Sequence, residues 1–203
     1  MDTPLTALAI SCTLKPSPAS SSSDLLARQL LDALAEHGVT GDLVRAVDFD
    51  IRPGVEKDMG DGDQWPALRE RVLDADILVL VTPTWMGQHS SVAQRVLERL
   101  DAELSETDEQ GRPILFDKVA IAGVLGNEDG AHHISAILFQ ALNDIGYTIP
   151  AQTSVYWNGE AMQTIDYKDL DETPEAVSSA IATASRNAAH LARQLTAQAY
   201  PAE

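Results

Sequence analysis

The sequence predicts a three-layer α/β fold in which a five-stranded parallel sheet has helices on both faces. Short apolar runs of strand length alternate along the chain with longer stretches whose apolar residues recur at helical spacing. Parallel neighbouring strands need a crossover connection, and a helix usually provides it. A chain of 203 residues with 44% hydrophobic content can bury one sizeable core but hardly two. We therefore expect a single domain over residues 1–203.

Five segments have the composition of buried strands. They cover residues 5–10, 42–47, 77–81 and 118–125, with a last strand within 147–157. The third segment is the clearest, because all of its residues are apolar. Pro150 blurs the bounds of the last strand, since proline cannot donate a hydrogen bond to a sheet.

Five helices are expected between and after these strands, from apolar residues that share one helical face. The apolar stripes run over residues 27–34, 66–73, 92–100, 134–145 and 177–195. Ser90 or Ser91 can cap the third helix, because a serine hydroxyl accepts a hydrogen bond from a free N–H of the first turn. Thr173 as the N-cap and Pro174 at the first helical position place the C-terminal helix at about residues 173–196.

The chain is strongly acidic, with a formal net charge of -17 from 31 acidic and 14 basic residues. Such a field repels nucleic acid and anionic lipid, so we expect neither nucleic acid nor a membrane as a partner. Two interpretations of the acidity stay open: an adaptation for solubility, or a surface that docks a basic redox partner. No stretch approaches the roughly 20 apolar residues of a membrane span, and residues 1–10 lack the features of a secretory signal. A single cysteine, Cys12, excludes an internal disulfide, and we expect a cytoplasmic protein.

The loop after the first strand has the composition of an anion site. In open parallel sheets ligands bind beyond the carboxyl ends of the strands. Here Thr13, Lys15 and a serine run at residues 20–23 stand directly before a helix N-terminus, where free N–H groups, hydroxyls and an ammonium group suit a phosphate. The alternative is an ordinary Ser-rich loop that only caps the helix. The fingerprints GxGxxG and GxxxxGK[ST] are absent, which disfavours a dinucleotide Rossmann site or a P-loop.

The loops after the third and fourth strands are suited to a planar ligand. The sequence TPTWMG at residues 82–87 places a proline and a glycine around Trp85 and Met86. Its backbone polar groups can face a flat ligand while these side chains supply apolar contact. A tryptophan buried in the core or in an interface is the alternative. The sequence GNEDGAHH at residues 126–133 adds two glycines and polar groups at a helix entrance.

Other motifs do not have the spacing that their chemistry needs. His132 and His133 are adjacent, so on a helix they point to different faces, and no third ligand has suitable spacing. The acidic stretch that begins at Asp58 is not an EF-hand loop, because its twelfth position is Arg69 rather than glutamate. We therefore predict no metal site. Cys12 could be a nucleophile, but no histidine can be tied to it, and a small buried residue is the alternative.

In this order the three loops resemble those of the flavodoxin-like NAD(P)H-dependent FMN reductase and quinone reductase superfamily, over roughly residues 5–157. The resemblance implies the strand order 2-1-3-4-5 and FMN as the cofactor. The residues that it implies for the FMN phosphate are Thr13, Lys15, Ser21, Ser22 and Ser23. Those that it implies around the isoalloxazine ring are Pro83, Thr84, Trp85, Met86 and Gly87. Those that it implies for the ring edge are Gly126, Asn127, Glu128, Asp129 and Gly130.

The first loop departs from the family pattern in two places. It carries an extra PSPA stretch at residues 16–19, and Asp24 lies close to the expected phosphate. The phosphate site is weakened unless Asp24 faces away from it. The FMN phosphate carries about two negative charges, and Lys15 with a helix terminus of about half a charge offsets only part of them. Neutral hydroxyl donors must hold the rest.

The resemblance implies an NAD(P)H-dependent flavin oxidoreductase that reduces quinones, free flavin, or nitro or azo compounds, with NADPH or NADH as the electron donor. Trp85 and Met86 are the expected walls of the ring or substrate pocket, and N–H groups near Gly87 and Gly126 are expected to stabilise the reduced flavin. The cofactor supplies the chemistry, so no catalytic residue is predicted. The family also implies a homodimer or homotetramer in which neighbouring subunits help to enclose the flavin.

Two other functions stay open from the sequence. A flavodoxin-type FMN electron carrier shuttles single electrons, and the acidic surface suits docking of a basic partner. A binding or signalling module of the same fold has no flavin, and an acidic cluster at the strand ends would indicate it. The role of Tyr156 and Trp157 also stays open from the sequence. They either join the wall around the flavin or end a core strand.

Overall fold

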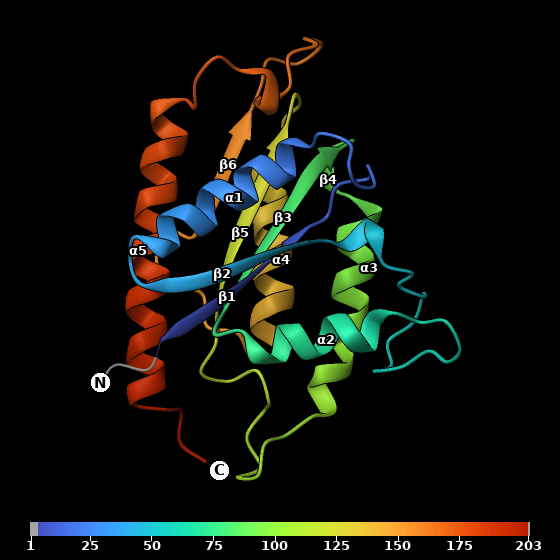
Figure 1. Ribbon diagram of the computed structural model, residues 1–203, viewed down its shortest axis with the longest axis vertical. Helices are drawn as coiled ribbons and strands as arrows, with labels where there is room; N and C mark the ends of the chain where they lie inside the picture. Colours follow the sequence, from blue (N-terminus) through green and yellow to red (C-terminus); the bar gives the residue numbers. More distant parts are fainter. Residues whose placement is uncertain (1–3, 203) are drawn as a thin grey trace.

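The computed structural model describes residues 4–202 and shows a parallel sheet between two layers of helices (Figure 1). Its long strands are β1 (Leu5–Ser11), β2 (Val39–Arg45), β3 (Ile77–Trp85), β5 (Val119–Gly126) and β6 (Ser154–Asn158). They pair in the order β2-β1-β3-β5-β6, and all of these neighbours are parallel. Counted over the long strands this is the expected order 2-1-3-4-5, so the predicted fold class is confirmed.

The helices of residues 4–202 cover both faces of the sheet. They are α1 (Ser22–Ala35), α2 (Trp65–Asp74), α3 (Ser91–Leu100), α4 (Ala131–Asp144) and α5 (Glu175–Ala197). Short 3-10 turns lie at Ala46–Asp48, Asp101–Ser105 and Tyr167–Asp169. The helices α1 and α5 pack on one face of the sheet, and α2, α3 and α4 pack on the other (Figure 1). In this part of the chain no helix has the length and apolarity needed to cross a membrane.

The strands β1, β2, β3 and β5 contribute to both cores by alternation of their side chains. In β3, Ile77, Val79 and Val81 belong to the core under α1 and α5. Leu78 and Leu80 of the same strand belong to the core under α2, α3 and α4. Because both faces are covered, every position from Ile77 to Val81 is apolar, which is why this segment gives the clearest strand signal in the sequence.

The edge strand β2 begins earlier than the sequence indicates. It runs from Val39 to Arg45, whereas residues 42–47 were expected. Its whole length pairs with β1, starting with Val39 opposite Leu5. After the buried Val39, residues 40–42 are exposed and none of them is a large apolar residue, so this part of the strand carries no apolar signal. Pairing with a neighbour, rather than composition, therefore determines where β2 starts.

The strand β3 extends to Trp85, beyond the expected end at residue 81. It stays paired with β5 up to Pro83, and the two-residue strand β4 (Gln88–His89) folds back on its end as a hairpin. Met86 and Gly87 form the turn with φ values of 52° and 71°, a region that glycine adopts without strain. The expected TPTWMG loop is thus the end of a strand followed by a tight turn.

Side-chain caps fix two helix starts, but the expected cap of α5 is wrong. Ser90 caps α3, since its Oγ accepts a hydrogen bond from the first turn at 3.1 Å. Thr173 does not cap α5, because its hydroxyl accepts a hydrogen bond from Nε2 of Gln29 at 2.7 Å. Pro174 is the N-cap residue instead of the first helical residue. Ser21 caps α1, which begins one residue later.

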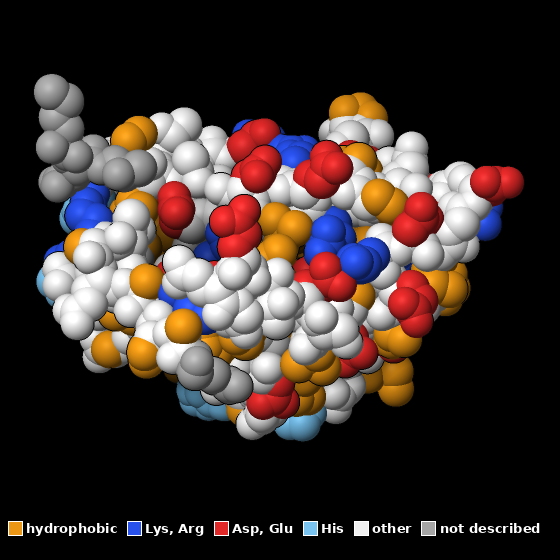
Figure 2. Space-filling model, turned by 90° about the horizontal axis from the view of Figure 1, so that it is seen from below, with side chains coloured by type: hydrophobic (Ala, Val, Ile, Leu, Met, Phe, Trp, Pro, Cys, Tyr) orange, Lys and Arg blue, Asp and Glu red, His pale blue; other side chains and the backbone are white. Residues whose placement is uncertain are grey.

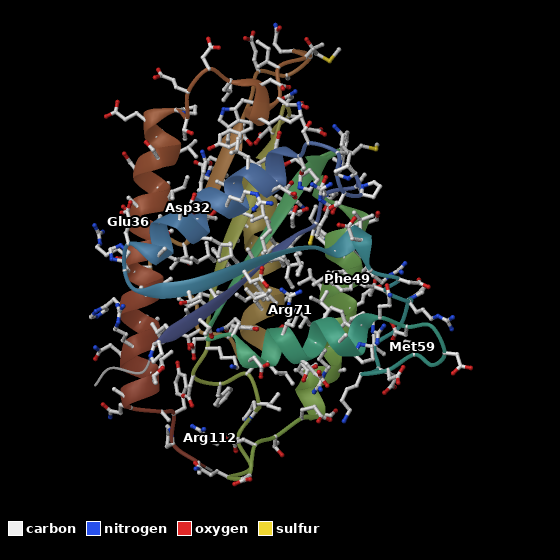
Figure 3. The ribbon with its side chains drawn as sticks, in the orientation of Figure 1. Asp32, Glu36, Phe49, Met59, Arg71 and Arg112 are labelled. Atoms are coloured by element: carbon white, nitrogen blue, oxygen red, sulfur yellow. The ribbon has the colours of Figure 1, made fainter. Side chains whose placement is uncertain are left out.

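A buried arginine holds the long polar loop between β2 and α2, on which Met59 is labelled in Figure 3. Arg99 donates hydrogen bonds to the carbonyl of Arg52 at 3.0 Å and to the carbonyl of Glu56 at 2.7 Å. Its Nη1 also lies 2.8 Å from Oδ2 of Asp63, and both side chains are fully buried. One side chain of α3 therefore fixes a loop that has no regular structure of its own.

The same contacts keep Asp63 ionised. Burial alone raises the pKa of Asp63, but hydrogen bonds from Arg99 and from the N–H groups of Met59, Trp65 and Arg52 outweigh burial and hold the pKa below its ordinary value. Because the folded-state pKa is lower than the unfolded one, Asp63 stabilises the fold above the ordinary carboxyl pKa. That contribution is lost as the pH falls from there towards the folded-state pKa.

Replacing Arg99 leaves Asp63 as a buried carboxylate without its counter-ion. We expect Arg99→Met to lower the free energy of unfolding by about 3 kcal/mol, the order found when one partner of a buried pair is removed. Urea unfolding at neutral pH measures this change. Arg71→Met is the matched control, because Arg71 pairs with Asp42, whose side chain is 75% exposed, and such pairs contribute about 0–1 kcal/mol. Equal losses in the two variants would contradict the role given to Arg99.

Candidate functional site

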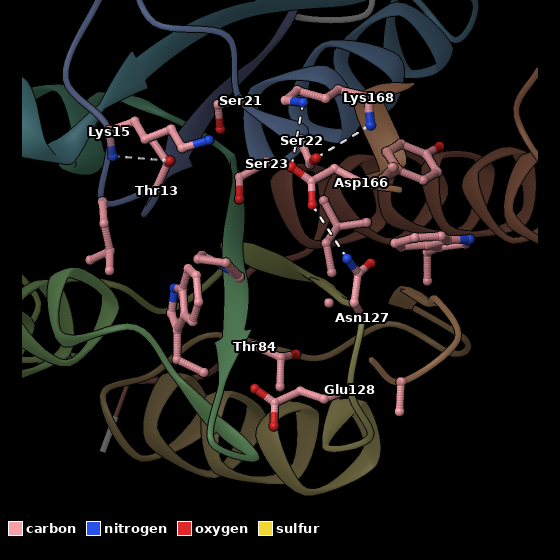
Figure 4. A pocket seen from close by; sticks show the side chains of 18 of the residues that line it. Thr13, Lys15, Ser21, Ser22, Ser23, Thr84, Asn127, Glu128, Asp166 and Lys168 are labelled. Atoms are coloured by element: carbon pink, nitrogen blue, oxygen red, sulfur yellow. Dashed lines mark hydrogen bonds and ion pairs between the residues drawn. The ribbon is translucent and has the colours of Figure 1, made fainter. Parts of the chain in front are cut away.

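A cavity of about 590 Å³ opens at the carboxyl ends of the strands (Figure 4). Its walls come from the loop after β1, the end of β3, the end of β5 with its following loop, and the segment after β6. The predicted cofactor-binding residues that it brings together are Thr13, Lys15, Ser21, Ser22, Ser23, Pro83, Thr84, Trp85, Gly126, Asn127 and Glu128. The predicted residues outside its lining are Met86, Gly87, Asp129 and Gly130.

One end of the cavity is built from hydroxyl and N–H groups at the start of α1. Ser21 is the N-cap residue, and its Oγ accepts a hydrogen bond from the N–H of Asp24 at 3.4 Å. Ser22 and Ser23 form the first turn, and Lys15 lies beside the serines (Figure 4). The helix N-terminus adds about half a positive charge. This end of the cavity is therefore suited to an anion.

Asp24 is neutralised by partners on the sheet side of α1. Its Oδ1 accepts a hydrogen bond from Ser11 Oγ at 2.6 Å, and its Oδ2 pairs with Arg45 Nη2 at 2.5 Å. Arg45 also donates to the carbonyl of Lys15 at 2.8 Å. The carboxylate that departs from the family pattern is not part of the cavity lining, and its partner fixes the backbone of the anion loop. Arg45 carried no sequence signal, because it lies on a distant edge strand.

The other end of the cavity is mainly apolar and aromatic. Pro83 and Trp85 come from β3, Leu125 from β5, and Trp157 from β6. Gly126 lets the loop after β5 approach closely, since a Cβ there would lie 2.7 Å from Cβ of Thr84. This slot between three strand ends is suited to a flat ligand.

The two loops at the rim are tied to each other. The N–H of Met86 donates a hydrogen bond to Glu128 Oε1 at 2.7 Å. A Cβ on Gly130 would lie 3.0 Å from Cα of Gly87, so only glycine allows this approach. The side chain of Met86 is 90% exposed and does not line the cavity, although the sequence indicated it as a wall. These residues shape the rim by joining the β3–β4 turn to the loop after β5.

One wall was missed from the sequence: the segment between β6 and α5. Its lining residues are Ala161, Met162, Asp166, Tyr167 and Lys168. The segment is polar and has neither strand nor helix periodicity, so no local pattern indicated that it lies at a site. Tyr167 fixes it, because its side chain is 2% exposed and its ring centre lies 5.6 Å from that of Trp157. The sequence signal for this wall was Tyr167 itself, an aromatic residue among charged ones.

The side chains considered for catalysis or metal binding lie outside the cavity lining. His132 Nε2 lies 3.1 Å from Tyr156 Oη, and His133 Nε2 lies 3.2 Å from Gln88 Oε1, so the adjacent histidines reach different partners. Among residues 4–202 no three potential metal ligands gather in one place. Cys12 is fully buried after β1, and burial raises the pKa of its thiol far above the ordinary value. A buried neutral thiol is a poor nucleophile.

The doubly wound sheet, the anion-suited loop after β1 and the apolar slot at the switch point of the strand order define a flavodoxin-like protein. The family model of NADPH-dependent FMN reductases matches residues 5–161. The chain belongs to this family.

Two relatives align with most of the chain. The 8-demethyl-8-aminoriboflavin-5'-phosphate synthase of Streptomyces davaonensis is 32% identical over 166 residues, which are 77% of this chain and 65% of the synthase. The divalent metal cation transporter MntH of Mycobacterium bovis is 44% identical over 169 residues, which are 81% of this chain and 25% of the transporter. The chain therefore spans only part of the length of each relative.

Solved structures include similar chains at two levels of identity. The crystal structure of RosB with the bound intermediate 8-demethyl-8-formylriboflavin-5'-phosphate has a TM-score of 0.87 and 31% identity, covering 97% of this chain and 82% of RosB. The apo form of the NADH:FMN oxidoreductase EMOB has a TM-score of 0.65 and 18% identity, covering 97% of this chain and 92% of that one. The second likeness shows the fold alone.

The burial of Cys12 predicts an unreactive thiol. We expect no reaction of the folded protein with a thiol-specific disulfide reagent at mildly alkaline pH, because the sulfur is enclosed and its thiolate form is suppressed. In concentrated guanidinium chloride the same reagent is expected to label the chain at once. Absorbance of the released chromophore measures both reactions. Rapid labelling of the folded protein would show that the end of β1 opens to solvent.

Proposed function

We propose that the protein is an FMN-dependent oxidoreductase that uses NADPH or NADH to reduce quinones, free flavin, or nitro or azo compounds. The observation that carries this proposal is one cavity with an anion-suited end at the start of α1 and an apolar, aromatic slot beyond it. FMN has the same division, with a phosphate at one end and a planar ring system at the other. A volume of about 590 Å³ is within the range of small-molecule sites.

The donor set of the cavity fits FMN. Thr13 and the three serines supply hydroxyl groups, and Lys15 supplies a charge, from the loop after β1 and the first turn of α1. At the other end Thr84 Oγ1 is buried and has no hydrogen-bond partner among residues 4–202. Buried polar atoms are nearly always paired, so this hydroxyl of a lining residue is free to pair with a ligand that reaches it.

When bound, FMN supplies the redox chemistry by accepting a hydride from a nicotinamide and passing reducing equivalents to an acceptor. The protein holds and orients the ring between Pro83, Trp85 and Trp157 and limits its contact with water. The carboxylate of Glu128 accepts a hydrogen bond from the N–H of Met86, which is one of the donors expected to face the flavin. That N–H serves a ligand only when the carboxylate of Glu128 turns away.

The relatives support a flavin phosphate as the ligand. RosB, at 31% identity, is known with a bound riboflavin-5'-phosphate derivative. The relative at 32% identity is named as a synthase of such a derivative. A flavin phosphate that is itself the substrate is therefore the second candidate function. The mass of the flavin recovered after turnover separates the two, since a cofactor returns as unchanged FMN.

The expected oligomer and the alternative of an electron carrier both need a docking surface on the outside of the protein. Trp85 is 54% and Met86 90% exposed at the rim, an apolar surface that a neighbouring subunit can cover in the expected homodimer or homotetramer. Figure 2 shows the end of the molecule away from the carboxyl ends of the strands, where acidic side chains are spread among basic ones.

Removal of the Trp85 side chain tests the ring slot. We expect the protein to bind FMN, and Trp85→Ala to weaken binding about tenfold, because an aromatic side chain stacked on a planar base contributes about 1–3 kcal/mol. Quenching of flavin fluorescence measures the affinity. Met86→Ala is the control, since Met86 is 90% exposed and outside the cavity lining, and we expect it to bind like the unaltered protein. Equal effects of the two substitutions would exclude Trp85 as a wall of the flavin site.

Rapid mixing separates the reductase from the electron carrier. We expect NADPH or NADH to bleach the flavin absorbance of the FMN-loaded protein directly, and a quinone to restore it. A carrier is reduced only when a partner reductase is added. Protein that binds FMN but oxidises neither nucleotide in the presence of a quinone would refute the reductase proposal.

A further inference from the structure

Residues 159–169, the segment between β6 and α5, close one side of the cavity and lie largely beyond the part of the chain that matches the family model. The N–H of Gly159 donates a hydrogen bond to the carbonyl of Gly126 at 2.7 Å, which ties the segment to the end of β5. Tyr167 Oη donates to Gln29 Oε1 at 2.7 Å, which ties it to α1. The 159–169 segment is thus fixed to two walls of the cavity.

Lys168 brings a second ammonium group to the anion-suited end of the cavity. Its backbone N–H donates a hydrogen bond to Ser22 Oγ at 3.3 Å, which fixes the lysine beside the first turn of α1. Lys168 and Lys15 both line the cavity, and Figure 4 shows them on opposite sides of the serines. Two cations from distant parts of the chain therefore flank one group of hydroxyl donors.

Two aspartates accompany Lys168. Its Nζ lies 2.5 Å from Asp169 Oδ2 and 3.4 Å from Asp166 Oδ2. The hydrogen bond with Asp169 holds the pKa of Lys168 above its ordinary value, so the lysine is charged at neutral pH. Asp166 lines the cavity and also accepts a hydrogen bond from Asn127 Nδ2 at 3.4 Å, whereas Asp169 is outside the lining. Asp169 is thus the closer counter-ion of Lys168, and Asp166 is the more distant one and the carboxylate that a bound anion meets in the cavity.

The charge of a phosphate monoester calls for a second cation. Such a group carries about −1.5 to −2 charges at neutral pH. Asp24 is already paired with Arg45, so Lys15 and the N-terminus of α1 remain, with about +1.5 charges together. Lys168 adds a further positive charge, which Asp166 and Asp169 offset for as long as they pair with it. Without Lys168 the positive groups fall short of a full dianion, and Lys168 makes up the difference only when a carboxylate gives it up.

We propose that Lys168 is a second phosphate-binding cation of this cavity, with Asp166 as the counter-ion that gives up the lysine when a flavin phosphate enters. The inference rests on the proposed function and deepens it. Riboflavin has the ring and ribityl chain of FMN without the phosphate charge. Lys168 and Asp166 therefore act on FMN and hardly on riboflavin, and together they set the preference between these two ligands.

The test compares the dissociation constants of FMN and riboflavin, measured by fluorescence quenching on the full chain and its variants. We expect Lys168→Met to lower the preference for FMN over riboflavin about tenfold, the order of one charge-assisted hydrogen bond. Lys168→Arg keeps the charge and should keep most of the preference. Asp166→Asn should raise the preference about threefold, because the neutral amide neither repels the phosphate nor competes for the lysine.

Lys57→Met is the matched control, since it also removes one lysine charge but Lys57 pairs with Glu106 outside the cavity lining. Its preference should equal that of the unaltered protein. An unchanged preference in Lys168→Met, or equal weakening of both flavins, overturns the inference and leaves the proposed function standing. Failure of the unaltered protein to bind either flavin overturns both. If Lys168→Met does not fold, as judged by thermal unfolding, an unchanged or lower preference in Asp166→Asn overturns the inference.

Discussion

The site depends on the register of β1, β3 and β5, which brings three carboxyl ends to one edge of the sheet. Ser11 at the end of β1 lies opposite Val81 in β3, and Pro83 lies opposite Leu125 in β5. β1 therefore stops four residues before the end of β3 at Trp85, whereas β3 and β5 run on side by side. Their spacing sets the width of the slot, and each strand is held there by apolar side chains buried on both faces.

The anion-suited end also depends on this register. Arg45 is the residue of β2 that lies opposite Ser11, and both side chains reach the carboxylate of Asp24. A buried carboxylate without partners is costly, and one left facing the cavity would repel an anion. The sheet thus supplies the guanidinium that compensates an acidic residue in the first turn of α1. The same guanidinium donates a hydrogen bond to the carbonyl of Lys15. Arg45 therefore both pairs with Asp24 and fixes the backbone of the loop after β1.

Features encoded in local patterns could be predicted from the sequence, whereas features that depend on contacts between distant segments could not. Alternating apolar stripes indicated the sheet and its helices, and hydroxyls before α1 indicated residues that line the cavity. The extension of β3 depends on pairing with β5 and β4, which no local pattern encodes. Thr173 is a residue type that often caps helices, but its hydroxyl accepts a hydrogen bond from Gln29 of α1 instead. Lys168 escaped notice because its segment is polar and is placed by Tyr167, whose partner is also on α1.

The single cysteine, Cys12, is placed where its thiol cannot react with small molecules in the cavity. Cys12 comes directly after β1, its N–H bonds to the carbonyl of Val81, and its carbonyl accepts a hydrogen bond from Ser90 Oγ, so the backbone on both sides is fixed. The sulfur is buried in the core under α2, α3 and α4 and keeps its proton. Electrophiles such as quinones alkylate exposed thiolates by conjugate addition. Molecules of this kind that enter the cavity meet no thiol among its lining residues, which protects the protein from covalent inactivation through cysteine.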